Sequence, residues 1–299
     1  STSKTPSYTK SVSWQHHHIL NYRNELLHGE TLYLDNPRSN KKGRTVRTVD
    51  NYIALLCSLL RFAYQSGFIS TKPFEGVKKL QRNRIKPDPL SKTEFNALME
   101  SEKGQSQNLW KFAVYSGLRH GELAALAWED VDLEKGIVNV RRNLTILDMF
   151  GPPKTNAGIR TVTLLQPALE ALKEQYKLTG HHRKSEITFY HREYGRTEKQ
   201  KLHFVFMPRV CNGKQKPYYS VSSLGARWNA AVKRAGIRRR NPYHTRHTFA
   251  CWLLTAGANP AFIASQMGHE TAQMVYEIYG MWIDDMNDEQ IAMLNARLS

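Results

Sequence analysis

The sequence is poor in cysteine and contains no long apolar run. Its three cysteines, Cys57, Cys211 and Cys251, are isolated and form no CxxC pair, which indicates a reduced, cytoplasmic protein. No stretch is apolar over the length that a membrane-spanning helix needs, and no signal peptide opens the chain. The sequence therefore predicts a cytoplasmic protein without a membrane partner.

Motifs that bind metal ions are also missing from the sequence. His244 and His247 lie three residues apart and His269 follows, but there is no HExxH motif, no cysteine partner and no suitably placed acidic ligand. Residues 16–18 are consecutive histidines, which would point to different faces of a helix and chelate a metal poorly. We therefore expect no metal site.

Acidic residues are scarce relative to basic ones. The chain of 299 residues has 43 Lys+Arg and 26 Asp+Glu, a net charge of +17, and residues 1–86 alone hold 15 basic and 5 acidic residues. Such an excess predicts a polyanionic partner, with DNA or RNA favoured over a membrane surface. The alternative is a solvated basic face that binds nothing.

Two domains are expected from the pattern along the chain. Residues 11–29 and 45–69 have apolar positions at helical spacing, and the charged segment 81–90 contains two prolines. We predict a small helical domain at 1–82, a linker at 83–89, a larger domain at 90–280 and a tail at 281–299.

The larger domain reads as mainly α with a small antiparallel β-sheet. Strands are expected on either side of the turn GPPKTNAG (151–158), and residues 181–219 are predicted to be loop apart from one short strand, HFVFM (203–207). Ser91 with Glu94 predicts a capping box. The expected helices cover 91–102, 109–133 with a break at Ser116–Gly117, 166–180, 220–237, 243–257, 259–268 and 270–280.

Several side chains fit a site that cuts phosphodiesters without metal. Such a site needs a nucleophile, cations that stabilise the pentavalent phosphorane and an acid for the leaving oxygen. Arg119 at a helix start and Arg246 are candidate phosphate clamps, Lys154 in a Gly/Pro turn is a candidate acid, and Tyr279 before Gly280 is a candidate nucleophile. Each also has an ordinary structural reading: a surface salt bridge, a solvated lysine or a core tyrosine.

Four motifs in this order resemble the tyrosine recombinase (phage integrase) family. They are SGLRHGELAAL (116–126), PPKTNAGIRTV (152–162), TRHTFACWLLTAG (245–257) and QMGHETAQMVYEIYG (266–280). The resemblance covers about residues 90–282. It implies a two-domain C-shaped clamp around DNA, in which the basic helical unit is a core-binding domain and the larger domain is catalytic.

The resemblance also implies the role of each residue. Arg119 and Arg246 correspond to the two catalytic arginines, and Glu122 supports Arg119. Lys154 corresponds to the β-hairpin lysine that protonates the 5′-oxygen, and His269 to the histidine that hydrogen-bonds the phosphate. Tyr279 corresponds to the nucleophile that forms a 3′-phosphotyrosine.

Two details of the tyrosines and histidines stay open at this point. Tyr276 is the competing nucleophile, but we interpret it as packing and expect Tyr279 at a helix end, where its hydroxyl can reach out. The family usually has histidine three residues before the second arginine, where this chain has Tyr243. We favour Tyr243 in that slot over His244, which a helix would turn by about 100°, although a phenol is a poor general base at neutral pH. His247 is interpreted as structural support.

Partners follow from the resemblance. Double-stranded DNA would be held in part by the basic residues Lys41, Lys42, Arg44 and Arg47, with the alternative that they form a disordered basic loop. A homotetramer on DNA is expected, with accessory DNA-bending proteins, no cofactor and a tail that packs in trans or in cis. The sequence leaves open whether a further DNA-binding domain lies upstream.

Three functions remain in view. A site-specific recombinase that integrates or excises a phage or related element, in the bacterial cytoplasm or nucleoid, is the main expectation. A type IB topoisomerase-like nicking-closing enzyme and a non-catalytic DNA-binding protein are the alternatives.

Overall fold

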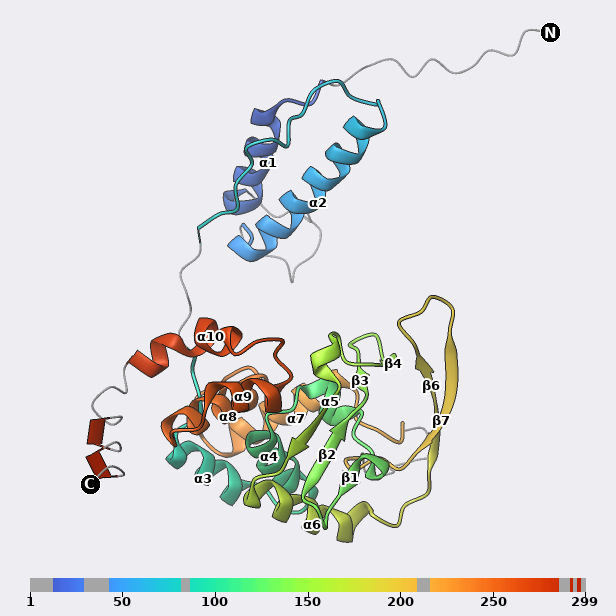
Figure 1. The fold of residues 1–299 in the computed structure, drawn as a ribbon, viewed down its shortest axis with the longest axis vertical. Coiled ribbons are helices and arrows are strands. Elements are labelled where there is room, and N and C mark those ends of the chain that lie inside the picture. Colours follow the sequence, from blue (N-terminus) through green and yellow to red (C-terminus); the bar gives the residue numbers. More distant parts are fainter. Residues whose placement is uncertain are drawn as a thin grey trace, which may run out of the picture. The chain divides into compact units, whose positions relative to one another are not determined.

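The computed structural model describes residues 13–29, 43–81, 87–208, 216–284, 291–292 and 295–296. The chain divides into two compact units, Ser1–Ile85 and Lys86–Ser299 (Figure 1). The division falls inside the segment that the sequence predicts as a linker. No helix in the described part is both long and apolar enough to cross a membrane.

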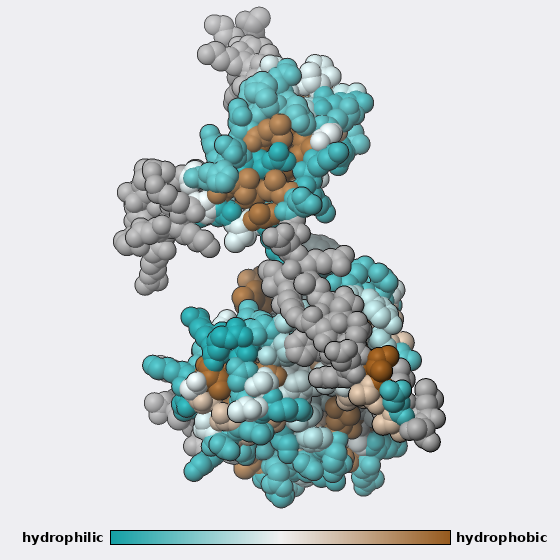
Figure 2. Space-filling model, turned by 90° about the vertical axis from the view of Figure 1, so that its left-hand side faces the viewer, coloured by the Kyte–Doolittle hydropathy of each residue, from teal (hydrophilic) through white to brown (hydrophobic). Residues whose placement is uncertain are grey.

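The first unit is built on two helices, α1 (His16–His28) and α2 (Val46–Gln65). Thr45 begins α2, and its hydroxyl accepts a hydrogen bond from the backbone N–H of Thr48 at 3.4 Å, as an N-cap should. The two helices share a small apolar core made of Ile19, Leu26, Val49, Ile53 and Leu60. Figure 2 shows apolar surface on this unit, and α2 leaves Tyr52, Leu55, Leu59 and Phe62 exposed.

The larger core of the second unit is formed by helices together with buried residues of the strands. It involves α3 (Lys92–Ser101), α4 (Gln105–Ser116), α6 (Gln166–Thr179) and α7 (Val221–Arg234). The predicted capping box is present, because the Ser91 and Glu94 side chains each accept from the other residue's backbone N–H. Helix α4 packs against α6 on one side and α8 on another, and its fully buried Trp110 meets Trp228 of α7 edge to face, with ring centroids 5.1 Å apart.

Strands of the second unit form two small sheets rather than one. Strands β1 (Val131–Asp132), β2 (Ile137–Val140) and β5 (Arg160–Thr163) are antiparallel, in the order β1-β2-β5. The other sheet has the order β3-β4-β6-β7 and consists of β3 (Asn143–Leu144), β4 (Phe150–Gly151), β6 (Ser185–Tyr190) and β7 (Thr197–Leu202). Within it, β4 and β6 are parallel and the other pairs antiparallel.

The hairpin of β6 and β7, which extends along one side of the unit in Figure 1, corrects the sequence prediction. The predicted strand 203–207 is absent, and only Phe204 forms an isolated bridge, to Ala127. Phe204, Val205 and Phe206 are apolar because they fill the core. Strand β7 (TEKQKL) is largely exposed and is held to β6 by backbone hydrogen bonds. Its sequence therefore lacks the alternation of apolar and polar residues by which a strand is predicted.

A smaller apolar cluster positions the candidate site. It joins α8 (His244–Thr255), α9 (Pro260–Met267) and α10 (Gln273–Asp284), and its buried members include Phe249, Cys251, Ile263, Met267 and Tyr279. The short helix α5 (His120–Ala124) follows α4 closely. Two 3₁₀ turns, η1 (Trp128–Asp130) and η2 (Asn156–Gly158), complete the described elements.

Candidate active site

The break between α4 and α5 sets the position of Arg119. Gly117 ends α4 with φ +64°, and a Cβ there would lie 2.5 Å from the Phe249 ring, so this position requires glycine both for its backbone and for space. The chain then turns, and Arg119 becomes the N-cap of α5. Its side chain is about one-third exposed. The prediction that Arg119 begins a helix is confirmed.

Glu122 is the buried acidic centre of the site. Its carboxylate accepts hydrogen bonds from the Arg119 backbone N–H at 2.9 Å and Nη1 at 3.0 Å. It also accepts from Arg160 Nη1 at 3.1 Å and Nη2 at 3.0 Å. Burial alone would raise the pKa of Glu122, but the charges of Arg160, Arg246 and Arg119 more than offset this and hold the pKa below its usual value.

Arg160, at the start of β5, is a member of the site that sequence reasoning missed. Its side chain is only 6% exposed, and it also donates to the backbone oxygens of Gln266 (2.7 Å) and Gly158 (2.9 Å). The sequence motif that contains Arg160 drew attention because of Lys154. The alternation of residues along a strand does not show that the Arg160 side chain pairs with a buried carboxylate. Glu122 therefore supports two arginines.

Arg246 is fully buried in the first turn of α8. Nη1 donates to the Gly117 carbonyl at 2.6 Å and Nη2 to the Met267 carbonyl at 2.5 Å, while Nε has no partner among the described residues. Burial and the neighbouring charge of Arg119 lower its pKa to about 10, so it remains protonated at neutral pH. Arg119, Arg160 and Arg246 against Glu122 leave this region with a net charge of +2, which favours an anion.

His269 lies beside the same arginines. Gly268 ends α9 with φ +65°, and the His269 backbone N–H then donates to Ala264 O at 2.9 Å. The side chain is 8% exposed, and Nδ1 has no partner in the described part of the chain. Burial, followed by the charges of Arg246, Arg119 and Arg160, lowers its pKa to about 4. The ring is therefore neutral at pH 7, and its unpartnered Nδ1 is buried.

The positions of the two tyrosines correct the expectation from sequence. Helix α10 continues through Gly280 to Asp284, so Tyr279 lies within the helix rather than at its end. Tyr279 and Val275, one turn apart, are 1% and 0% exposed, whereas Tyr276 is 49% exposed. The interpretation of Tyr276 as a packing residue is wrong, because the face of α10 that meets α8 is the Val275–Tyr279 face.

His247 is the residue that contacts the Tyr279 hydroxyl. Its Nδ1 lies 2.9 Å from Tyr279 Oη. Tyr243, the N-cap of α8, is 39% exposed and stacks edge-on against the His247 ring at 5.1 Å. His244 uses Nδ1 to donate to the Asp88 carbonyl at 2.7 Å. Among the described contacts, neither Tyr243 nor His244 forms a hydrogen bond with Tyr279. His247, which the sequence predicted to give only structural support, forms this bond.

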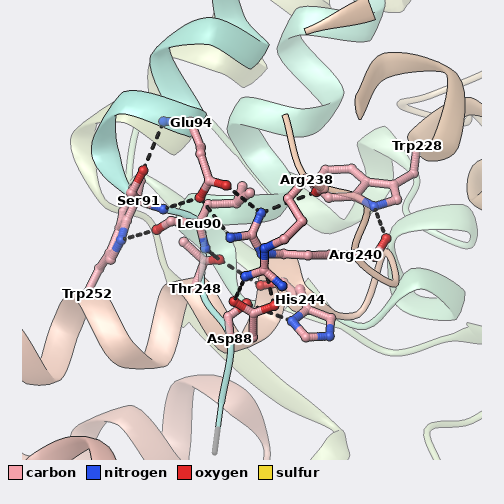
Figure 3. A network of polar contacts seen from close by, with 10 residues as sticks. All are labelled: Asp88, Leu90, Ser91, Glu94, Trp228, Arg238, Arg240, His244, Thr248 and Trp252. Carbon is pink, nitrogen blue, oxygen red and sulfur yellow. Dashed lines mark hydrogen bonds and ion pairs between the residues drawn. The ribbon is translucent and has the colours of Figure 1, made fainter. Parts of the chain in front are cut away.

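A polar network holds the first turns of α8 against the start of the second unit (Figure 3). Arg240 donates to both carboxylate oxygens of Glu94 at 2.7 and 2.8 Å. The backbone of Leu90 donates to Thr248 Oγ1 at 2.9 Å and accepts from Trp252 Nε1 at 3.0 Å. Together with the His244 contact, these bonds fix the helix that carries Arg246 and His247.

Lys154 is not at the tip of a hairpin. Strands β4 and β5 belong to different sheets, so Lys154 lies in the connection between them, just before η2. Arg192 holds this connection by donating to Pro153 O at 2.7 Å and to the side chain of Asn156. The Lys154 side chain is exposed, between two anchored neighbours.

The predicted DNA contacts fall in the first unit. Lys41 and Lys42 lie outside the described residues. Arg44 is half-buried and its backbone N–H donates to Leu26 O at 2.7 Å, while Arg47 is exposed on the first turn of α2. In the expected tail, α10 continues past residue 280, and most of residues 285–299 lie outside the described part.

Comparison with known proteins identifies the class. The sequence pattern of the phage integrase family matches residues 89–281. The protein IntQ of Escherichia coli (strain K12), whose name describes it as defective, is 46% identical over 94% of this chain and 71% of its own length. A tyrosine recombinase XerC-like protein of Caldanaerobacter subterraneus subsp. tengcongensis is 26% identical over 86% of this chain and 67% of its own.

Solved structures agree on the fold. The Tn1549 transposon integrase in complex with a circular intermediate DNA aligns with a TM-score of 0.66 and 21% identity, over 89% of this chain and 81% of that one. The fold and these relatives define a DNA strand transferase of the tyrosine recombinase class. The chain belongs to the phage integrase family, and the matched region contains every candidate site residue from Arg119 to Tyr279.

Proposed function

We propose that this site-specific recombinase integrates and excises a phage or related mobile element, with Tyr279 as its nucleophile. The observation that carries the proposal is the cluster of net charge +2 formed by Arg119, Arg160, Arg246 and Glu122 beside the buried Tyr279 hydroxyl. A phosphodiester carries one negative charge, and the phosphorane formed by attack carries two. The charge of the cluster therefore matches the transition state better than the ground state.

Each residue then has a chemical role. Tyr279 Oη attacks the scissile phosphorus, the P–O5′ bond breaks, and a 3′-phosphotyrosine forms. Arg119 and Arg246 stabilise the equatorial oxygens, and His269, neutral at pH 7, hydrogen-bonds one of them. Lys154 gives a proton to the leaving O5′, for which its exposed place in an anchored connection is suited.

Rejoining reverses these steps. A 5′-hydroxyl attacks the phosphotyrosine, and one phosphoester bond replaces another, so the reaction needs neither a metal ion nor a nucleotide. Tyr243 is proposed to donate a hydrogen bond to the phosphate from the usual histidine position, because it is part-exposed next to His247. His244 is the alternative, and its bond to Asp88 would first have to break.

The proposed assembly is a homotetramer on two DNA sites, in the cytoplasm where such DNA is found. The first unit would be a core-binding domain that closes with the catalytic domain into a C-shaped clamp, with Arg44 and Arg47 on phosphates. The C-terminal tail would link neighbouring protomers in trans or pack in cis. Accessory DNA-bending proteins would set the direction.

A nicked suicide duplex carrying the recombination site tests this function. We expect a covalent protein–DNA band on a denaturing gel with the wild type, none with Tyr279→Phe, and an undiminished band with the matched control Tyr276→Phe. A band that persists in Tyr279→Phe contradicts the nucleophile. No band in the wild type favours a non-catalytic DNA-binding protein, and relaxation without joint products from two sites favours a topoisomerase.

A further inference from the structure

The Tyr279 hydroxyl is enclosed, and the described hydrogen bond that it makes goes to a single side chain. Tyr279 is 1% exposed, and its Oη is 2.9 Å from His247 Nδ1. The two rings meet edge to face with centroids 5.7 Å apart. His247 and Cys251 are one turn apart on α8, on the side that packs against α10. The histidine is therefore placed on the hydroxyl by two packed helices.

We infer that His247 accepts the Tyr279 proton during strand cleavage in this chain and returns it during rejoining. This inference rests on the proposed function, and it gives His247 a catalytic role in place of the structural one expected from sequence. It fits the departure at Tyr243, because a phenol in the usual histidine slot cannot act as an efficient base at neutral pH.

Other nearby groups are less suited to accept this proton. His244 is turned to the Asp88 carbonyl at 2.7 Å within the network of Figure 3. Tyr243 packs edge to face against the His247 ring, and the described hydrogen bond of Tyr279 Oη goes to His247. His269 is surrounded by the three arginines, whose charges lower its pKa, and serves the phosphate.

In the free protein the electrostatic environment keeps both His247 and Tyr279 neutral. Burial, then the charges of His244 and Arg246, lower the pKa of His247 to about 4. Burial raises the pKa of Tyr279 well above its usual value, although Arg246 acts in the opposite direction. The tyrosine therefore keeps its proton in the free protein.

A bound phosphate changes this balance. Its negative charge lies among the arginines and favours the protonated form of the neighbouring histidine. The groups that face His247 are Tyr243, His244 and Arg246 from α8, Tyr279 from α10, and His269 before α10. No acidic side chain of the described residues belongs to this set, so a bound phosphate would supply its negative charge and raise the basicity of His247.

The step is a balanced proton transfer coupled to bond formation. In the tautomer with its proton on Nε2, His247 Nδ1 accepts the Oη proton while the Oη–P bond forms. The P–O5′ bond breaks, and O5′ takes a proton from Lys154. On rejoining, the 5′-hydroxyl gives its proton back to Lys154 as the O5′–P bond forms, the P–Oη bond breaks, and His247 returns its proton to Oη.

Substitution of His247 by glutamine separates basicity from position. Glutamine retains a hydrogen-bond acceptor but cannot take up a proton at these pH values. We expect His247→Gln to bind DNA like the wild type and to cleave the suicide duplex at least about 100-fold more slowly. The surface variant His182→Gln is the matched control, since His182 is exposed and remote in sequence from the site motifs.

A modified substrate identifies the end of the reaction at which His247 acts. A duplex with sulfur in place of the bridging O5′ has a leaving group that needs no acid. It should restore cleavage by Lys154→Ala but leave His247→Gln slow. Rescue of His247→Gln by this substrate would place the residue at the leaving group and overturn the inference.

The pH dependence of wild-type cleavage tests the inference without relying on the folding of a variant. The wild-type single-turnover cleavage rate should fall on the acid side, along one titration limb with an apparent pKa above that of the free protein. A wild type without this limb contradicts the inference. Wild-type rates in His247→Gln would also do so, while loss of the covalent band in Tyr279→Phe would still support the proposed function.

Discussion

Replacing Glu122 by glutamine tests the buried charge arrangement directly. The carboxylate is 1% exposed and accepts four hydrogen bonds, two from Arg119 and two from Arg160. An amide of the same size keeps one acceptor oxygen, turns an NH₂ group toward a guanidinium and removes the compensating charge. Arg160, only 6% exposed, is then a buried cation without a partner of opposite charge.

The size of the effect follows from that burial. Removing one partner of a buried ion pair costs about 3–5 kcal/mol in the free energy of unfolding. In a domain of about 200 residues, each kcal/mol lowers the melting temperature by about 2–4 °C, so a decrease of roughly 6–20 °C is expected. Cleavage should also slow, because Arg119 loses the carboxylate that orients it toward the phosphate.

Calorimetry of the full chain, with the transition of the larger unit followed separately, measures this shift. Glu174→Gln is the matched control, since Glu174 pairs with Lys177 on an exposed helix face and should leave the transition unchanged. A double-mutant cycle with Arg160→Gln should show strong coupling. A Glu122→Gln transition that coincides with that of Glu174→Gln would refute the assignment of Glu122 as the support of buried cations.

Three further predictions follow from the same geometry. The pKa values of His247 and His269 are about 4 in the folded protein, against about 6.5 in the unfolded chain. As the pH falls from about 6.5 to 4, the unfolded state therefore binds protons that the folded state does not, and the free energy of unfolding should decrease. Denaturant titrations at several pH values measure this decrease. Gly117→Ala, with φ +64° and a Cβ in contact with the Phe249 ring, should lower the melting temperature and abolish cleavage, and an unchanged melting temperature would contradict this account. Lys154→Ala should leave the melting temperature unchanged, because the side chain is exposed, yet slow cleavage by about 10²–10⁴-fold; a rate close to that of the wild type would remove Lys154 from the mechanism.

Short-range sequence patterns predict much of this fold. Helix spacing and capping residues locate most helices, as the capping box of Ser91 and Glu94 shows. The exposed strand β7 has no apolar alternation, so its pairing with β6 could not be foreseen. Gly280 does not end α10, because packing of Val275 and Tyr279 on α8 continues the helix past it.

Residues of the candidate site could be predicted from the sequence where a motif contains a residue type with a single chemical role. The order of the motifs predicted Arg119, Arg246, His269 and Tyr279 as site residues. In the structure, Arg246 lies close enough to the other three to interact with them electrostatically. Contacts between distant motifs are harder to predict from the sequence. The ion pair of Arg160 with Glu122, for example, joins residues that are 38 positions apart.

The His247 contact illustrates the same limit. His247 and Tyr279 are 32 residues apart, and no local pattern shows which of three neighbouring aromatic and histidine side chains will face the nucleophile. Helix periodicity places His244 on a different face of α8 from Tyr243. The packing of α8 on α10 determines that His247 is the residue that contacts Tyr279.

The central claim is a covalent bond between DNA and Tyr279, and mapping that bond tests it most directly. The protein trapped on a suicide duplex would be digested with nuclease and protease, and the peptide carrying a residual 3′-phosphonucleotide would be sequenced by tandem mass spectrometry. We predict the phosphonucleotide on Tyr279, with Tyr276 in the same peptide unmodified. Attachment to Tyr276, to Tyr243 or to a serine would contradict this account.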